Sequence, residues 1–456
     1  MTAVASPVPR IDAPALERVQ LGLLAAVAAT CLVSIFAAEV VFLAPAVLVL
    51  VYRLVTRRTS PITTPLDGPI LAFVVWTLLS ASFSPSPLES HESAKKLVLF
   101  ALLYLTIDSV RDAEQRRRVL DVALLGGLAV GAEVLLQVFF LGYDTLDKRP
   151  RGFLGHYMTA SGLLTCALVL AAARLAFHRG PVERPRREDL QGLGILAAAL
   201  TLLAALQRFD IMAVEAERLF VAGLGAAAAY LVLSRRPAWP SAATSSTLAL
   251  VALAVCSWAI LLTQTRSAWL GGVAGLAVVA ILRAPKLLWA LIAAVAMVLL
   301  LRPASVVDRL TVTDASSRNR IYLWQAGVDM IREKPIFGVG PDMVQQVYAE
   351  YRWPGAPEDT ASHLHSNAFH IAAERGLPCL VFWLWWVAAA MGDAYRAVRT
   401  RGGEAATYGA AAMGLLVAIM VAGLFEYNFG DSEILMLVLI VSALPYTFRD
   451  ADAVPA

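Results

Sequence analysis

The sequence predicts an all-α polytopic integral membrane protein, built as a bundle of 12–14 transmembrane helices with a helical cap between late spans. Hydrophobic residues make up 59% of the 456 residues and charged residues only 16%, whereas a soluble protein carries about 25% charge. The mean hydropathy is +0.66. The apolar residues also fall in blocks of about 16 to 23, the length that crosses a bilayer as a helix.

Fourteen apolar blocks can be recognised along the chain. They lie at about 20–38, 40–52, 68–83, 95–110, 119–141, 157–177, 191–206, 219–234, 246–264, 267–283, 286–301, 377–396, 406–424 and 432–448. Three of them, at 40–52, 191–206 and 286–301, are short or weakly bounded, so the number of spans stays open between twelve and fourteen. The N-terminus lacks the pattern of a cleaved signal peptide, and we expect the first span to direct insertion.

Basic residues predict the orientation. Arginines gather in one set of alternate loops, for example at 116–118 and 235–236. Short loops rich in arginine face the cytoplasm, so both termini should lie inside. The opposite loops, including the long polar segment 302–376, should face outside, which is the periplasm of a Gram-negative cell.

This pattern divides the chain into three parts. Residues 1–301 should form an N-terminal transmembrane bundle of about eleven apolar blocks, 302–376 a periplasmic helical cap carrying catalytic residues, and 377–456 C-terminal transmembrane helices with a short cytoplasmic tail. Within the cap we expect helices at about 318–333 and 345–352, and a glycine turn at 336–342.

His365 is the strongest candidate for chemistry. It precedes Ser366-Asn367, a helix-start signal, and Gly376 with Pro378 forms a helix-stop signal. His365 should therefore lie at the N-terminus of a short helix, where the helix dipole disfavours a protonated imidazole. A neutral histidine beside an anion site can act as a general base. The alternative is a polar loop histidine without chemistry.

Two arginines suggest an anion site near this helix. Arg266 lies between two apolar blocks with almost no loop, where an arginine is costly unless it faces a polar cavity or an anion. Arg320 lies in the first turn of the predicted cap helix, and its guanidinium suits phosphate. The alternatives are snorkelling of Arg266 to the headgroups and a solvated helix surface for Arg320.

Other residues are weaker candidates. Arg208 lies in a short outer loop whose acidic residues can simply pair with it. His363 and His370 are expected to be structural, the latter packed in mid-helix, and His156 either lines a cavity or marks the membrane interface. The four cysteines, Cys31, Cys166, Cys256 and Cys379, read as small core residues. Outer aspartates are few, which argues against a Mg²⁺ or Mn²⁺ site.

Several motifs in one order resemble the O-antigen ligase and polymerase superfamily of bacterial envelope glycosyltransferases. The residues that carry the resemblance are GHYMTASG (155–162), TQTRSAW (263–269), R-x-x-x-W from Arg320 to Trp324, FGVG (337–340), and His365 with Gly376 eleven positions later. The resemblance covers about residues 150–440. Members of the family are usually described with twelve spans, and the fourteen blocks of this chain depart from that pattern.

The resemblance implies an inner-membrane enzyme that takes a glycan from undecaprenyl diphosphate and, in the ligases, joins it to a lipid A–core sugar at the periplasmic face. His365 matches the family's essential histidine, and Arg266 and Arg320 match its essential arginines. We assign Arg208 to the diphosphate as well. No cofactor, metal ion or nucleic-acid partner is expected.

Two other functions stay open. A polymerase of the same superfamily shares this machinery and differs in its acceptor. A transporter or flippase of a lipid-linked glycan would also place arginines around a cavity among many spans, although no paired halves typical of transporters are apparent.

Overall fold

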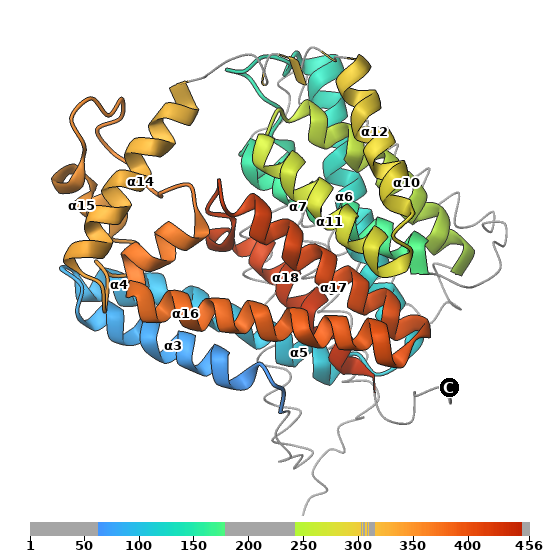
Figure 1. Cartoon of the computed structure of the whole chain (residues 1–456), viewed down its shortest axis with the longest axis horizontal. Helices are drawn as coiled ribbons and strands as arrows, with labels where there is room; N and C mark the ends of the chain where they lie inside the picture. The colour runs from blue at the N-terminus through green and yellow to red at the C-terminus, as the bar shows by residue number, and fades with distance from the viewer. Residues whose placement is uncertain are drawn as a thin grey trace, which may run out of the picture.

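The computed structural model describes residues 63–177, 242–301, 303, 306–307, 309 and 315–448, and these residues contain helices without any strand (Figure 1). The α-helices are α3 (Asp67–Ser82), α4 (Pro87–Ser93), α5 (Ala101–Ser109), α6 (Ala113–Leu141), α7 (Tyr157–Phe177), α10 (Ala242–Leu262), α11 (Arg266–Arg283), α12 (Leu287–Leu301), α14 (Ala315–Glu333), α15 (Val344–Tyr351), α16 (Asn367–Arg396), α17 (Gly403–Ala422) and α18 (Ser432–Ala443). Shorter helical turns are η1 (Ala94–Phe100), η2 (Gly152–Leu154), η3 (Ala397–Arg401), η4 (Asn428–Gly430) and η5 (Leu444–Thr447).

Six of the described helices are long and apolar enough to cross a membrane: α6, α7, α10, α11, α16 and α17. Shorter apolar helices occur at Asp67–Ser82, Leu287–Leu301 and Ser432–Thr447. The predicted all-α polytopic membrane protein is confirmed. The apolar blocks at 20–38, 40–52, 191–206 and 219–234 lie outside the described residues, so the total number of spans stays a prediction.

Glycine brings two of the spans into close contact. Gly271 and Gly275 lie one turn apart on α11 and face α17. A Cβ on Gly271 would lie 2.6 Å from the Ala418 carbonyl oxygen, and one on Gly275 would lie 2.9 Å from the Gly414 carbonyl oxygen. Small residues four positions apart allow two helix backbones to approach this closely. The resulting van der Waals contacts stabilise helix association in lipid, where the hydrophobic effect does not drive it.

The polar segment before α16 has a small core of its own. The amphipathic helix α14 and the shorter α15 bury Leu323, Met330, Val344 and Tyr348 against one another. In Figure 1 α14 and α15 lie beside the start of α16, next to the end of α3 and α4. The predicted helices at 318–333 and 345–352 are therefore present, with bounds shifted by one to three residues.

A kink at Gly376 divides α16 into a short polar helix and a long apolar one. Gly376 has φ +80°, a left-handed conformation, and Pro378 lacks the N–H that would continue the hydrogen bonds of the helix. The carbonyls released by the break are bonded by the FGVG turn, because Val339 N donates to Ala373 O (2.9 Å) and Gly340 N to Glu374 O (2.8 Å). The predicted helix from Asn367 to Arg375, ending at Gly376, is confirmed.

We predict that Gly376→Ala destabilises the protein strongly. A Cβ at this position would lie 1.9 Å from the Ile336 carbonyl oxygen, and left-handed backbone alone costs a non-glycine residue about 1–2 kcal/mol. Gly392→Ala is the matched control, since it lies in the same helix with open space around it and should be neutral or stabilising by up to about 1 kcal/mol. Thermal unfolding in detergent measures both, and equal melting temperatures would contradict the role of the kink.

Candidate active site

A single carboxylate, that of Glu426, lies at the centre of the site. Glu426 follows α17 and is only 8% exposed. Its Oε1 lies 3.1 Å from Nδ1 of His365 and 3.4 Å from Nε2 of His363. Its Oε2 lies 3.8 Å from a guanidinium nitrogen of Arg320. The structure therefore brings together His365 and Arg320, two of the residues that the sequence singled out.

Glu426 and His363 stabilise each other's charged forms. Burial alone would raise the pKa of Glu426, but the hydrogen bonds from His363 and His365 outweigh it and hold this pKa well below its usual value. Burial lowers the pKa of His363, and the hydrogen bond to Glu426 and its charge more than offset this, so the net pKa is raised. Glu426 is thus ionised at neutral pH and can only accept hydrogen bonds.

The ionised carboxylate determines which histidine nitrogen carries a proton. Because Glu426 can only accept, Nδ1 of His365 must donate at 3.1 Å. In a neutral imidazole the other ring nitrogen, Nε2, is then an acceptor. A carboxylate that fixes the tautomer and orientation of a histidine in this way is the arrangement used by histidine general bases.

Two loops that are distant in sequence are bonded together to form the cluster. Asn367 at the start of α16 donates its backbone N–H to Gly423 O (2.8 Å) and its side-chain amide to Asn428 Oδ1 (2.7 Å). Asn367 Oδ1 also accepts from Phe429 N (3.0 Å). The loop with His365 is therefore held against the loop with Glu426.

His365 itself has a backbone conformation that few non-glycine residues adopt, with φ +49°. Trp324 of α14 holds the preceding residue, because its Nε1 donates to Leu364 O (3.1 Å). This contact gives a structural reason for the spacing between Arg320 and Trp324. Such left-handed residues cost free energy and cluster at functional sites.

Arg266 reaches the same region from α11. One of its guanidinium nitrogens donates to Ser317 Oγ (2.6 Å) and another lies 3.4 Å from Arg309 O. Ser317 and Arg320 are three residues apart on α14, so they are neighbours on the helix surface. Arg266 and Arg320 thus converge on the first turns of α14, and the N-terminus of a helix favours anions.

The remaining candidates fall in different places. His363, for which the sequence favoured a structural role, lies in the cluster with its ring 4.3 Å from that of His365. His370 is packed as expected, with Nε2 3.1 Å from Glu374. His156 lies near enough to Glu426 and both cluster histidines for their charges to affect its pKa, which burial lowers. Arg208 lies outside the described residues.

Three residues near the site, Glu426, Asp431 and Arg309, were not predicted from the sequence. Burial and the charge of Glu426 raise the pKa of Asp431 to about 6, and the buried Arg309 donates from Nε to Gln264 O (3.0 Å). The only sequence signal for Glu426 was its place at the end of an apolar block in the outer loop EYNFGDSE. That signal identifies an acid at the membrane edge without giving its partners.

The same cluster offers a set of metal donors. One atom each from His363, His365 and Glu426 lie within 4.8 Å of one another. Two imidazoles and a carboxylate suit Zn²⁺ better than Mg²⁺, which differs from the carboxylate-rich site that the sequence argued against. Arg320 places a positive charge on the same carboxylate, which opposes a divalent cation there.

Comparison with known proteins adds a family to this geometry. Residues 251–384 match the family model described as O-antigen ligase. This match supports an assignment to the O-antigen ligase superfamily. The matched range contains Arg266, Arg320 and His365 but not Glu426. No curated protein gives a significant match.

The family match supports a function of the ligase or polymerase type. The chain is a multi-pass membrane protein, and the match favours lipid-linked glycans in general as its substrates. The resemblance expected from TQTRSAW, FGVG and the histidine segment is thereby confirmed.

We predict that Glu426→Gln lowers thermal stability most at mildly acidic pH. The raised pKa of His363 means that its ion pair with Glu426 contributes fully below the ordinary value of 6.5 and is lost as the pH rises through the raised pKa. The difference in melting temperature between wild type and variant should therefore be largest near about pH 6 and shrink toward about pH 9. The exposed Glu350 provides the control Glu350→Gln. A pH-independent difference for Glu426→Gln would contradict the ion pair.

Proposed function

We propose that this protein is an O-antigen ligase, which transfers a glycan from undecaprenyl diphosphate to a lipid A–core sugar by a metal-independent, inverting displacement in lipopolysaccharide biosynthesis. The observation that carries the proposal is the contact of His365 with the ionised Glu426 (3.1 Å). It leaves Nε2 of His365 as a proton acceptor beside an arginine that can bind phosphate.

In this reaction His365 acts as the general base. Its Nε2 removes the proton from the acceptor hydroxyl as the oxygen attacks the anomeric carbon of the donor. The bond from that carbon to the diphosphate breaks, and the electron pair leaves with undecaprenyl diphosphate. Glu426 stabilises the imidazolium that forms, as a buried carboxylate does for other histidine bases. Attack from the face opposite the leaving group inverts the anomeric centre without a covalent intermediate.

Arg320 and Arg266 stabilise the leaving diphosphate. The Arg320 ion pair to Glu426 is long, at 3.8 Å, and its buried Nε has no hydrogen-bond partner among the described residues, so N–H groups remain for a phosphate. Arg266 adds a second guanidinium near the start of α14. Preorganised donors of this kind act most strongly in a site that excludes water. Arg208 belongs to the same proposal as a third diphosphate ligand.

The proposal also includes the place of the reaction. Following the arginine asymmetry, we place the protein in the bacterial inner membrane with both termini in the cytoplasm and the site facing the periplasm. In this view residues 302–376 form the periplasmic cap between the N-terminal bundle, 1–301, and the C-terminal helices, 377–456. The support is that α14, α15 and the loop of His365 lie together at one side of the bundle (Figure 1).

A transfer assay in detergent tests the base directly. We expect His365→Ala to lower the transfer rate by at least about 10²–10⁴-fold, since general base catalysis contributes that much, while donor affinity stays near that of wild type. Arg320→Lys keeps the charge but loses the two-pronged geometry, so donor affinity should fall. An active His365→Ala enzyme, or one that fails only because donor no longer binds, would rule out the base.

The same assay separates the competing functions. Purified donor is offered with lipid A–core or with a second donor molecule as the rival acceptor. Transfer to lipid A–core supports the ligase, and elongation of the second donor supports a polymerase. A transporter would convert neither substrate in detergent, where no gradient exists.

A further inference from the structure

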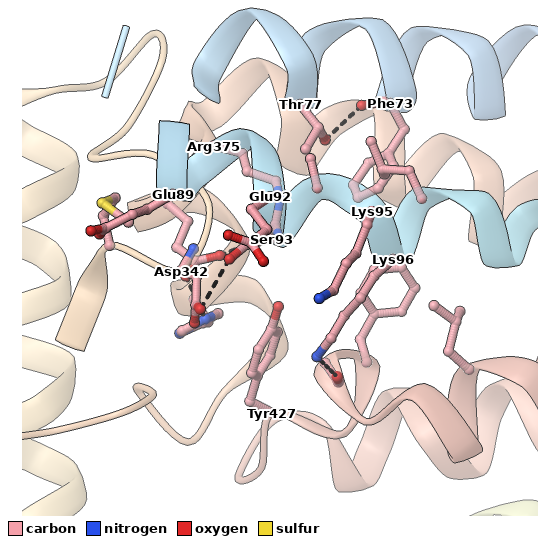
Figure 2. Close-up of a pocket in the computed structure, with 18 of the residues that line it drawn as sticks. Phe73, Thr77, Glu89, Glu92, Ser93, Lys95, Lys96, Asp342, Arg375 and Tyr427 are labelled. Atoms are coloured by element: carbon pink, nitrogen blue, oxygen red, sulfur yellow. Dashed lines mark hydrogen bonds and ion pairs between the residues drawn. The ribbon is translucent and has the colours of Figure 1, made fainter. Parts of the chain in front are cut away.

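A cavity of about 470 Å³ lies beside the histidine cluster, between α4, η1, the start of α16 and the loop after Glu426 (Figure 2). Its size is that of sites for small ligands. Neither His365 nor Arg266 nor Arg320 lines it. The cavity and the cluster share one wall, since Tyr427 lines the cavity and directly follows Glu426 in the chain.

Tyr427 is fixed between the two sites. Its ring lies 3.7 Å from that of His370 and 6.4 Å from that of His363. Its backbone N–H donates to Oε1 of Glu426 (3.1 Å). A ligand in the cavity would thus be separated from Glu426 by Tyr427, on a side where His370 and Arg375 form part of the wall and His365, Arg266 and Arg320 do not.

Opposite charges line the two sides of the cavity. Figure 2 shows Glu92 and Asp342 on one side and the ammonium groups of Lys95 and Lys96 on the other, with the Tyr427 hydroxyl directed between them. Lys96 donates to Gly430 O (3.1 Å). In the part of the chain that the structure describes, neither lysine is held in an ion pair. Phe73, Phe100 and Phe429 add an apolar side.

We propose that this cavity binds the acceptor, an oligosaccharide that carries an anionic group, and that Lys95 and Lys96 recognise this group. Sugar hydroxyls can donate to the carboxylates of Glu92 and Asp342, which accept hydrogen bonds when ionised. A phosphate or carboxylate on the same glycan is attracted by the two ammonium groups. The proposal rests on the proposed transferase function, and it adds that acceptor and donor approach Glu426 from different sides.

The position of the cavity favours acceptor over donor. The donor diphosphate needs the arginines at α11 and α14, and no residue of those helices lines the cavity. The acceptor instead needs a path to Nε2 of His365 from a separate side, because the attacking oxygen and the leaving group occupy opposite faces of the anomeric carbon. The cavity meets the cluster at Tyr427 and is separate from α11 and α14, and we infer that the acceptor approaches from there.

The test is binding and transfer by the full-length protein in detergent, with the double variant Lys95→Ala/Lys96→Ala and the control Lys286→Ala, an exposed lysine that does not line the cavity. The probes are lipid A–core that bears phosphate on its core sugars and the same glycolipid after removal of those phosphates. We expect the double variant to bind the phosphorylated acceptor about tenfold more weakly, the effect of losing charged hydrogen bonds. Its affinity for dephosphorylated acceptor and for donor should match that of wild type.

Other outcomes would overturn the proposal. Unchanged acceptor binding by the double variant would exclude the lysines, and weaker donor binding would assign the cavity to the donor. Phosphatidylglycerol vesicles that compete as well as the acceptor would assign it to a lipid headgroup instead. Binding is measured apart from transfer, so a protein that binds acceptor through these lysines but transfers no glycan would refute the proposed function and leave the cavity assignment standing.

Discussion

The site depends on the placement of one buried carboxylate among three cationic or protonated partners. Glu426 accepts from His363 and His365 and lies near Arg320, and a buried charge of this kind is tolerated only when it is paired. Removing any of these partners would leave the negative charge of Glu426 only partly compensated. The same contacts fix the His365 tautomer, so one set of interactions supplies folding stability and, in the proposed reaction, the orientation of the base.

That placement requires α14, the polar start of α16 and the membrane helices to hold their relative positions. The kink at Gly376 lets the FGVG turn bond the carbonyls of Ala373 and Glu374, while Asn367 joins the two loops at the start of the same helix. His365 therefore lies between Leu364, whose carbonyl oxygen accepts from Trp324, and Asn367, which is bonded to the loop after Glu426. A rigid segment of this kind can hold a histidine in a left-handed conformation that a free loop would avoid.

Local signals explain what the sequence predicted. The short helix after His365 and its end at Gly376 follow from capping residues and from the glycine and proline that stop a helix. The spans follow from the length of apolar blocks. The sequence could not give the partner of His365, because Glu426 is 61 positions away and the two meet only after α16 and α17 pack. For the same reason His363 was expected to be structural. The sequence placed Arg266 and Arg320 at one anion site but could not give the contact of Arg266 with Ser317.

The central claim is that His365 and Glu426 form a base and its orienting carboxylate, although His363, His365 and Glu426 also present donor atoms suited to a metal ion. Transfer by purified wild-type protein after exhaustive treatment with a chelator separates these two roles most directly. The account predicts that the rate is unchanged and that added Zn²⁺ gives no increase. A rate that is lost on chelation and restored by one equivalent of Zn²⁺ would contradict it, because the same atoms cannot hold a metal and leave His365 as the free base.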